Sequence, residues 1–248
     1  MIKLLKIINF EHHRSEFWSG NMNTEIFKQM SNADINTIID GSQPFVRLMT
    51  YYGCALREVE TKLQVLNDEF KLTHDRNPIE SIKSRIKTPQ SIVDKLERRG
   101  IEANVSNPEE YIRTIERELF DIAGIRVICA FPDDIYKLAE QLISQDDITL
   151  IRTKDYILSP KPNGYRSLHL IVEVPVFFSS GKRNMKVEVQ LRTMAMDFWA
   201  SLDHKLRYKK DLENQDDIAD ELKKCADVIT ETDYRMQQLR KMIDGYQF

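Results

Sequence analysis

Apolar residues recur at steps of three and four along the first well-patterned part of the chain. Starting at Phe45, they are Leu48, Met49, Tyr52, Leu56, Val59, Leu63, Leu66 and Phe70. Residues three and four apart share one face of a helix. The spacing therefore predicts one long amphipathic helix, roughly over 41–73.

Three dipeptides that contain proline then mark turns and helix starts. Asn77-Pro78 is interpreted as a turn and a helix-start signal. Thr88-Pro89 and Asn107-Pro108 each place a capping side chain before a proline that suits the first helical turn. We expect the helix after Thr88-Pro89 to reach about Arg99 and to stop at Gly100.

After Gly124 the pattern changes to short β-branched and alternating segments. Strands are predicted over 125–131, 149–156, 167–176 and 186–193. Helices are predicted over 133–144 and from Thr193, which is expected to cap the helix that follows it. The fold class is therefore α+β, with a mixed sheet in the middle and helices at both ends.

The C-terminal segment carries an apolar stripe with heptad spacing. Its members are Ile218, Leu222, Cys225, Ile229, Thr232, Met236, Leu239 and Ile243. The stripe can pack on the helix's own domain, or it can form a seam between subunits. We divide the chain into a poorly patterned segment over 1–40, a domain over 41–210 and this heptad helix over 211–248.

Composition narrows the function classes. The chain has 248 residues, of which 42% are hydrophobic and 30% are charged, with a formal net charge of −3. This is typical of a soluble globular protein and excludes one that coats nucleic acid through general positive charge. No apolar run approaches the roughly 20 residues that span a bilayer. Three scattered cysteines indicate a reducing, cytoplasmic setting.

Two acids stand out as candidate metal ligands. Over 186–193, period-two alternation places Glu188, Gln190 and Arg192 on one face of a strand. Asp121 lies inside the apolar stretch LFDIAGIR, where a carboxylate needs a partner or a metal. Either acid alone could be a salt-bridge partner or a cap. As a pair, they suit Mg²⁺ bound to nucleotide phosphates.

Positive charge gathers in the segment 81–100. It contains six lysines and arginines against two acids: Lys83, Arg85, Lys87, Lys95, Arg98 and Arg99 against Asp94 and Glu97. On a helix, Ser91, Lys95 and Arg98 or Arg99 share one face. Such a face suits a triphosphate. A solvated basic surface is the alternative.

A third candidate site is the segment 160–169. Two prolines, an asparagine and a glycine predict an ordered turn that ends at Tyr165. A tyrosine at this position can stack a base, and Lys161 and His169 can donate hydrogen bonds to phosphate. The segment could equally be a plain connection between strands.

Four motifs, in order along the chain, carry a family resemblance: DIAGIR, KPNGYRSLH, EVQLRT and AMDFWASLDHKL. They resemble the synthetase domain of the RelA/SpoT-type (p)ppGpp synthetases, over roughly 45–245. The segments NPIE…SRIK and SPKPNGYRSLHL are similar to the RelP/YwaC-like branch of the small alarmone synthetases. The resemblance implies a nucleotidyltransferase-like fold, a cytoplasmic homotetramer and transfer of pyrophosphate from ATP to the 3′-hydroxyl of GDP or GTP.

The resemblance also implies residue roles. Asp121 and Glu188 would bind Mg²⁺, with Glu188 also activating the hydroxyl. Arg85 and Arg126 would stack on adenine. The remaining ATP-binding residues would be Lys87, Ser91, Lys95, Arg98 and Arg99. The guanosine nucleotide would be bound by Lys161, Asn163, Tyr165 and His169, with Gln190 and Arg192 in supporting roles.

Two other functions remain open on the sequence. A toxin-type relative would pyrophosphorylate the 3′ end of tRNA, and a non-catalytic relative would only sense nucleotides. The intact Asp121 and Glu188 pair disfavours the second, and a mixed surface charge disfavours a stable nucleic-acid partner. The hydrolase domain of bifunctional relatives uses several separated His and Asp residues as metal ligands. This chain has a single His-Asp dipeptide, His74-Asp75, so we expect synthesis without hydrolase activity.

Overall fold

The computed structural model describes residues 32–73, 76–102, 107–207 and 215–245. The chain divides into two compact units, one of Met1–Tyr51 with Ile86–Ile122 and one of Tyr52–Arg85 with Ala123–Phe248. Most of the poorly patterned segment 1–40, namely 1–31, lies outside the described residues, as does His74-Asp75. The long N-terminal helix is confirmed as α3 (Asn32–Thr73), which begins earlier than predicted.

The first unit contains the two short helices that the proline dipeptides predict, α4 (Pro89–Arg98) and α5 (Pro108–Glu118). The Thr88 hydroxyl accepts a hydrogen bond from the Ser91 amide at the start of α4. The Asn107 side chain accepts one from the Glu110 amide at the start of α5. Each cap satisfies an amide that has no partner within its own helix, which is why both helices begin there.

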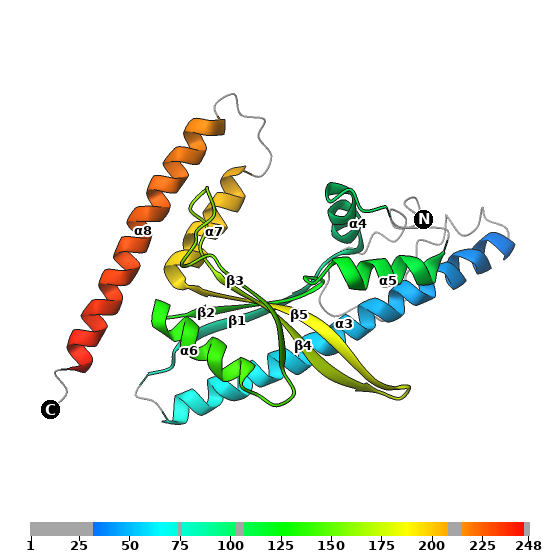
Figure 1. Ribbon diagram of the computed structural model, residues 1–248, viewed down its shortest axis with the longest axis horizontal. Helices are drawn as coiled ribbons and strands as arrows, with labels where there is room; N and C mark the ends of the chain where they lie inside the picture. Colours follow the sequence, from blue (N-terminus) through cyan, green and yellow to red (C-terminus); the bar gives the residue numbers. More distant parts are fainter. Residues whose placement is uncertain (1–31, 74–75, 103–106, 208–214, 246–248) are drawn as a thin grey trace. The chain divides into compact units, whose positions relative to one another are not determined.

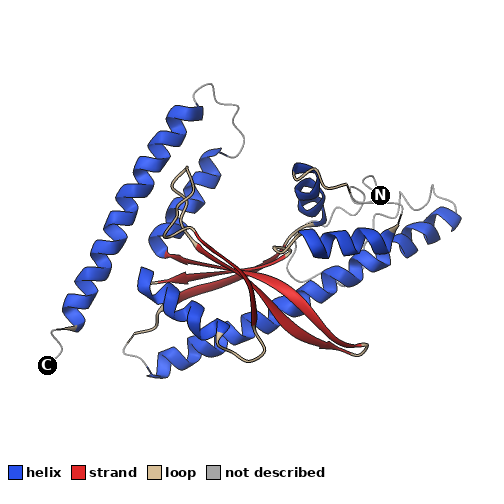
Figure 2. Cartoon of the chain, in the orientation of Figure 1, coloured by secondary structure: helices blue, strands red, loops and turns tan. Residues whose placement is uncertain are grey.

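A five-stranded mixed sheet lies at the centre of the second unit (Figures 1 and 2). The predicted mixed sheet is confirmed, but the sequence predicts only four of its five strands. The central strand β5 pairs in parallel with β2 and antiparallel with β4, and β4 pairs antiparallel with β3. In spatial order the strands are β1 (Ile79–Ile86), β2 (Ala123–Cys129), β5 (Gly181–Thr193), β4 (Leu168–Phe178) and β3 (Thr149–Asp155).

The strand β1 corrects the sequence prediction. No helix starts after Asn77-Pro78, because the Asn77 side chain accepts a hydrogen bond from the Ile79 amide and turns the chain directly into β1. The apolar residues Ile79, Ile82 and Ile86 are spaced three and four apart, which mimics a helix, but pairing within the sheet overrides that local preference. The basic segment 81–100 is therefore a strand followed by a helix.

The predicted alternation of β5 is confirmed. Val187, Val189 and Leu191 are fully buried on one face. Glu188 and Gln190 are only partly buried on the other, next to the buried Arg192. The core of the second unit thus lies against one face of β5, and the opposite face is left for polar side chains.

Two C-terminal helices, α7 (Met194–Arg207) and α8 (Gln215–Asp244), pack against each other. The Thr193 hydroxyl accepts from the Met196 amide, which confirms the predicted cap, and donates to Asp233 of α8 at 2.6 Å. The Trp199 indole donates to the Leu222 carbonyl. The predicted heptad stripe is buried only in part, because Met236 and several other members are exposed.

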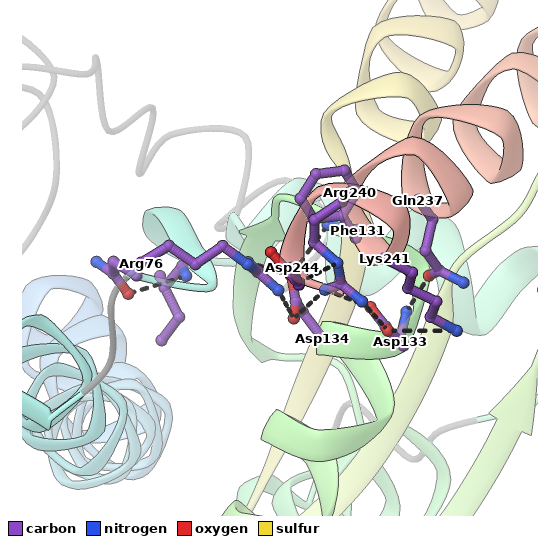
Figure 3. A network of polar contacts seen from close by, with 10 residues as sticks. Arg76, Phe131, Asp133, Asp134, Gln237, Arg240, Lys241 and Asp244 are labelled. Atoms are coloured by element: carbon purple, nitrogen blue, oxygen red, sulfur yellow. Dashed lines mark hydrogen bonds and ion pairs between the residues drawn. The ribbon is translucent and has the colours of Figure 1, made fainter. Parts of the chain in front are cut away.

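Ionic contacts fasten the end of α8 to α6 (Pro132–Ile143), as Figure 3 shows. Both terminal nitrogens of Arg240 donate to Asp133, at 2.5 and 3.2 Å, and one lies 3.7 Å from Asp134. Asp134 accepts two further bonds from Arg76, at 2.6 and 2.8 Å. Both guanidinium groups lie about 5 Å from the centre of the Phe131 ring.

Replacing Arg240 should destabilise the second unit. In the variant Arg240→Gln, the nearly buried Asp134 keeps its bonds from Arg76 and the Phe131 amide but loses its second cation, and Asp133 loses its bidentate partner. We expect the free energy of unfolding to fall by about 2–3 kcal/mol, measured by denaturant titration. Arg235→Gln is the matched control, because its ion pair with Glu231 is exposed and should contribute little. Equal losses in the two variants would contradict this prediction.

Candidate functional site

Three neighbouring strands of the second unit bring polar side chains to one face of the sheet. Gln190 of β5 lies opposite Arg126 of β2 and opposite His169 of β4. Glu188 and Arg192 flank Gln190 on the same face. The sheet register therefore gathers residues that the sequence predicts for both nucleotides.

Four of these side chains, together with Tyr165 from the turn before β4, form a closed ring of hydrogen bonds. Nη2 of Arg192 donates to the Tyr165 hydroxyl at 2.6 Å and to Oε1 of Gln190 at 3.1 Å. Nε2 of Gln190 donates to Oε2 of Glu188 at 2.8 Å. His169 closes the ring, with Nε2 at 2.8 Å from the Tyr165 hydroxyl and Nδ1 at 3.2 Å from Oε1 of Glu188.

The ring fixes the tautomer of His169. An ionised Glu188 can only accept, so Nδ1 of His169 must carry a proton. In the neutral imidazole Nε2 then accepts, and the Tyr165 hydroxyl supplies that proton while it accepts from Arg192. Donors run from Arg192 in both directions around the ring and converge on the carboxylate of Glu188. The ring therefore fixes the side-chain orientations of Glu188 and Tyr165 relative to each other.

The turn before β4 is ordered, as predicted. The Gly164 amide donates to the Lys161 carbonyl at 2.8 Å, and the Tyr165 amide donates to the Asn163 side chain at 3.3 Å. Gly164 has a φ of +87°, in the left-handed region that favours glycine. A Cβ atom at this position would lie 2.5 Å from the Cβ of Ala226 on α8, so the turn is seated directly on that helix.

Lys161 lies beside two tyrosine rings. Its Nζ is 4.8 Å from the centre of the Tyr156 ring and 4.7 Å from that of Tyr165. The two rings meet edge to face at 5.9 Å. Burial and the charge of Lys154 lower the pKa of the Lys161 ammonium. The end of the turn is thus an aromatic and cationic surface.

Two arginines of this face share one carboxylate oxygen. Oδ1 of Asp197, in the first turn of α7, lies 3.1 Å from Nη1 of Arg192 and 3.3 Å from Nη1 of Arg126. Burial lowers the pKa of Arg126, and the charges of Arg192 and Arg85 add to that effect while Asp197 opposes it. Arg85 lies on β1 and Arg126 on β2, which are neighbouring strands of the sheet, and their assignment to adenine stays a prediction.

In the first unit, Asp121 holds two lysines. Its Oδ2 lies 2.5 Å from Nζ of Lys95 and 3.1 Å from Nζ of Lys87. Burial alone would raise the pKa of Asp121, but the hydrogen bonds and charges of the two lysines hold it below its usual value. Asp121 is thus an anion, and its buried Oδ1 has no hydrogen-bond partner among the described residues.

The other predicted ATP-binding residues of the first unit form hydrogen bonds with groups of the same unit. The Ser91 hydroxyl is 2.9 Å from that of Thr88. Nε of Arg98 donates to the Asp94 carbonyl at 3.2 Å, and Nη1 of Arg99 donates to the Glu118 carbonyl at 2.7 Å. Lys95 is therefore the residue of the predicted helix face that turns to Asp121.

The described residues lack two features. They contain no group of three or more His, Cys, Asp or Glu side chains placed to hold a metal ion. Within the same residues, no helix is both long enough and apolar enough to cross a membrane.

A protein-family model described as the region found in RelA / SpoT proteins matches residues 84–213, more than half of the chain. The chain belongs to the RelA/SpoT family. The matched residues include Asp121 and all of the turn and strand residues that form the hydrogen-bonded ring.

Individual members of the family are also similar. GTP pyrophosphokinase YwaC of Bacillus subtilis is 44% identical over 193 residues, which cover 78% of this chain and 89% of that protein. The crystal structure of the small alarmone synthetase 1 from Bacillus subtilis bound to its product pppGpp has a TM-score of 0.72 at 33% identity. It covers 80% of this chain and 97% of the other. The same synthetase bound to AMPCPP has a TM-score of 0.66 at 29% identity and covers 81% and 98%.

Two residues near the hydrogen-bonded ring of this RelA/SpoT family chain, Tyr156 and Asp197, are not predicted from the sequence. Tyr156 follows β3 at the end of a predicted strand, and nothing in its local pattern marks it as a neighbour of Tyr165. Asp197 lies inside the quoted motif AMDFWASLDHKL, where an acid in the first turn of a helix has an ordinary structural explanation. Only the tertiary contacts distinguish the two.

Substitution of Gly164 should disturb the turn. Gly164→Ala adds a Cβ atom where Ala226 already lies, in a backbone conformation that alanine rarely adopts. We expect a loss of about 1–3 kcal/mol in the free energy of unfolding, measured by urea titration. Gly53→Ala is the control with the opposite sign. Gly53 lies inside α3 with open space around its Cα, so alanine should stabilise the helix by about 0.5–1 kcal/mol. A stabilising Gly164→Ala would contradict the description of the turn.

Proposed function

We propose that this chain is a GTP pyrophosphokinase. It transfers the β,γ-pyrophosphate of ATP to the 3′-hydroxyl of GDP or GTP and so produces ppGpp or pppGpp together with AMP. The similarity to YwaC over most of both chains and to a synthetase that holds pppGpp supports this activity. The observation that carries the proposal is the closed ring of hydrogen bonds, because it holds a carboxylate and an aromatic platform in fixed relation.

In this proposal the turn and its neighbours bind the guanosine nucleotide. Tyr165 stacks on guanine, and its ring is held at the hydroxyl by Arg192 and His169. Lys161 lies against the same ring and supplies positive charge for the phosphates. Asn163 shapes the turn through its bond to the Tyr165 amide. Gln190 supports Glu188 from the other side of the ring.

Glu188 is proposed as the general base. It accepts the proton of the 3′-hydroxyl as the 3′-oxygen attacks the β-phosphorus of ATP. The bond between that phosphorus and the oxygen bridging to the α-phosphorus then breaks, and AMP leaves with the bridging oxygen. Within the ring, each carboxylate oxygen of Glu188 accepts one bond, and these two bonds hold the carboxylate in one orientation.

The ATP-binding roles follow from cationic side chains in each unit. In the second unit, Arg85 and Arg126 offer planar guanidinium groups on adjacent strands, which suit stacking on adenine. In the first unit, the proposal assigns the phosphates to the basic and hydroxyl side chains Lys87, Ser91, Lys95, Arg98 and Arg99. Lys87 and Lys95 have the strongest support, because both side chains are partly buried and converge on one carboxylate.

Mg²⁺ is the proposed cofactor, and by family resemblance Asp121 of the first unit and Glu188 of the second unit are each candidate ligands. Asp121 fits the ion, because it is anionic and its buried Oδ1 has no hydrogen-bond partner among the described residues. Mg²⁺ commonly takes one or two carboxylates together with waters and substrate phosphates. When bound, it would neutralise charge on the transferring group. The two lysines on Asp121 keep its carboxylate deprotonated and ready to coordinate.

The proposal includes a homo-oligomer in the cytoplasm, a tetramer by family resemblance. Members of the heptad stripe on the second half of α8 are exposed within this chain, among them Met236, Leu239 and Ile243. The buried face of that half carries polar residues such as Asp233 and Gln237. An apolar stripe that its own chain leaves uncovered supports a seam between subunits.

A transfer assay tests the proposed activity. The protein is incubated with Mg²⁺, ATP labelled in the β-phosphate and GDP, GTP or tRNA, and the products are separated. We expect label on GDP and GTP together with release of AMP. Label on tRNA alone would replace the proposal with an RNA-modifying activity. Binding of nucleotides without any transfer would replace it with a sensing function.

The variant Glu188→Gln tests the base. It should lower the transfer rate by at least about 100-fold, because an amide cannot take the hydroxyl proton, while ATP binding stays near that of the unsubstituted protein. The matched control is Glu173→Gln, on β4 of the same sheet, whose carboxylate accepts a bond from Asn184 outside the ring. Retained turnover in Glu188→Gln would show that another group is the base.

Light scattering tests the assembly. The paired substitutions Leu239→Glu and Ile243→Glu place charge on the exposed stripe of α8. We expect them to lower the measured mass below that of the unsubstituted protein, because burying unpaired carboxylates between subunits is unfavourable. An unchanged mass would count against a seam at this stripe. Glu substitutions at Val65 of α3, which is also exposed, provide a control for added surface charge.

A further inference from the structure

Asp197 lies beside the hydrogen-bonded ring but has no role in the proposed reaction. It lies in the first turn of α7, directly after β5, and its side chain is 21% exposed. One oxygen, Oδ1, faces Nη1 of Arg192 at 3.1 Å and Nη1 of Arg126 at 3.3 Å. A single carboxylate thus contacts two guanidinium groups from two different strands.

The need for this carboxylate follows from the burial of Arg192, whose side chain is only 6% exposed. Removing a guanidinium from water is unfavourable unless an anion and hydrogen-bond acceptors replace the lost hydration. Arg126 adds a second positive charge close by, and the two cations repel each other. Asp197 offsets both charges at the point where they meet.

Asp197 also sets the orientation of the guanidinium plane of Arg192. Nη1 is bound to Asp197, while Nη2 donates to both the Tyr165 hydroxyl and Gln190. Because the guanidinium group is planar and rigid, fixing Nη1 fixes the direction of Nη2. Both arms of the hydrogen-bonded ring start at Nη2, so the orientation of Tyr165 and Glu188 depends on an acid that belongs to neither arm.

We propose that Asp197 is a positioning residue for the acceptor nucleotide. It holds Arg192, and through Arg192 it aligns the stacking ring of Tyr165 with the carboxylate of Glu188. The inference rests on the proposed function, which assigns Tyr165 to the guanosine nucleotide and Glu188 to its hydroxyl. The contact to Arg126 is longer and more exposed, so Asp197 acts mainly on the acceptor side.

The variant Asp197→Asn keeps the size of the side chain and removes its charge. We expect KM for GDP, and the Kd of GDP measured by calorimetry in the absence of ATP, to rise about tenfold. KM for ATP should change by less than about threefold. Asp68→Asn is the matched control, because the Asp68 side chain is 72% exposed on α3 and pairs with Lys71 of the same helix. Equal changes for both nucleotides, or a change for ATP alone, would overturn the inference.

A double substitution separates positioning from general weakening of the fold. If Asp197 acts through Arg192, then Asp197→Asn combined with Arg192→Gln should bind GDP within about twofold of Arg192→Gln alone. Effects that multiply would overturn the inference. If Asp197→Asn does not fold, Asp197→Glu keeps the charge one methylene further away, and it should raise the Kd of GDP by less than Arg192→Gln does. Equal or greater weakening would overturn the inference.

The outcomes for the inference and for the proposed function are distinguishable. Failure of the unsubstituted protein to transfer pyrophosphate removes the proposed function, whatever Asp197 does. Normal transfer together with an unchanged Kd of GDP in Asp197→Asn removes only the positioning role.

Discussion

β5 runs between β2 and β4, and its side chains alternate between an apolar face and a polar face. On the apolar face Val187, Val189 and Leu191 are fully buried and join the core of the second unit. On the polar face Glu188, Gln190 and Arg192 meet residues from both neighbouring strands. A shift of one residue in register would exchange the two faces. The burial of the apolar side chains that fixes the register therefore also puts Glu188, Gln190 and Arg192 on the polar face.

Carboxylates that hold two cations recur in both units. Asp121 binds Lys87 and Lys95 in the first unit, and Asp197 binds Arg126 and Arg192 in the second. The chain has a formal net charge of −3, yet at each of these two places two cations lie beside one carboxylate. Positive charge is therefore concentrated locally, and each cation still has an anion next to it. Such preorganised charge suits phosphoryl transfer, in which positioning and electrostatics do most of the work.

The C-terminal helix α8 supports the turn over 161–165 from outside the sheet. Ala226 lies against Gly164, and Leu222 accepts a hydrogen bond from Trp199 of α7. Further along, Arg240 ties the helix to Asp133 at the start of α6. The helix is therefore seated by a small apolar contact near the turn and by ionic contacts near its end. This arrangement leaves the apolar stripe on its second half exposed within the chain.

Local sequence determined much of this protein. The caps at Thr88, Asn107 and Thr193, the alternation along β5 and the rigid turn before Tyr165 all depend on neighbours within a few residues, and the family motifs depend on order along the chain. These features could be predicted because short-range hydrogen bonds and period-two burial leave a direct imprint on the sequence.

Only the tertiary structure decided the rest. β1 has helix-like apolar spacing and becomes a strand because the sheet offers it a partner. The face that α8 buries is set by Thr193 and Asp133, residues far away in the chain. Tyr156 and Asp197 belong to the site through contacts with Tyr165 and Arg192 that no local pattern records. A side chain's role is fixed by the partner it meets, and folding, rather than sequence spacing, selects that partner.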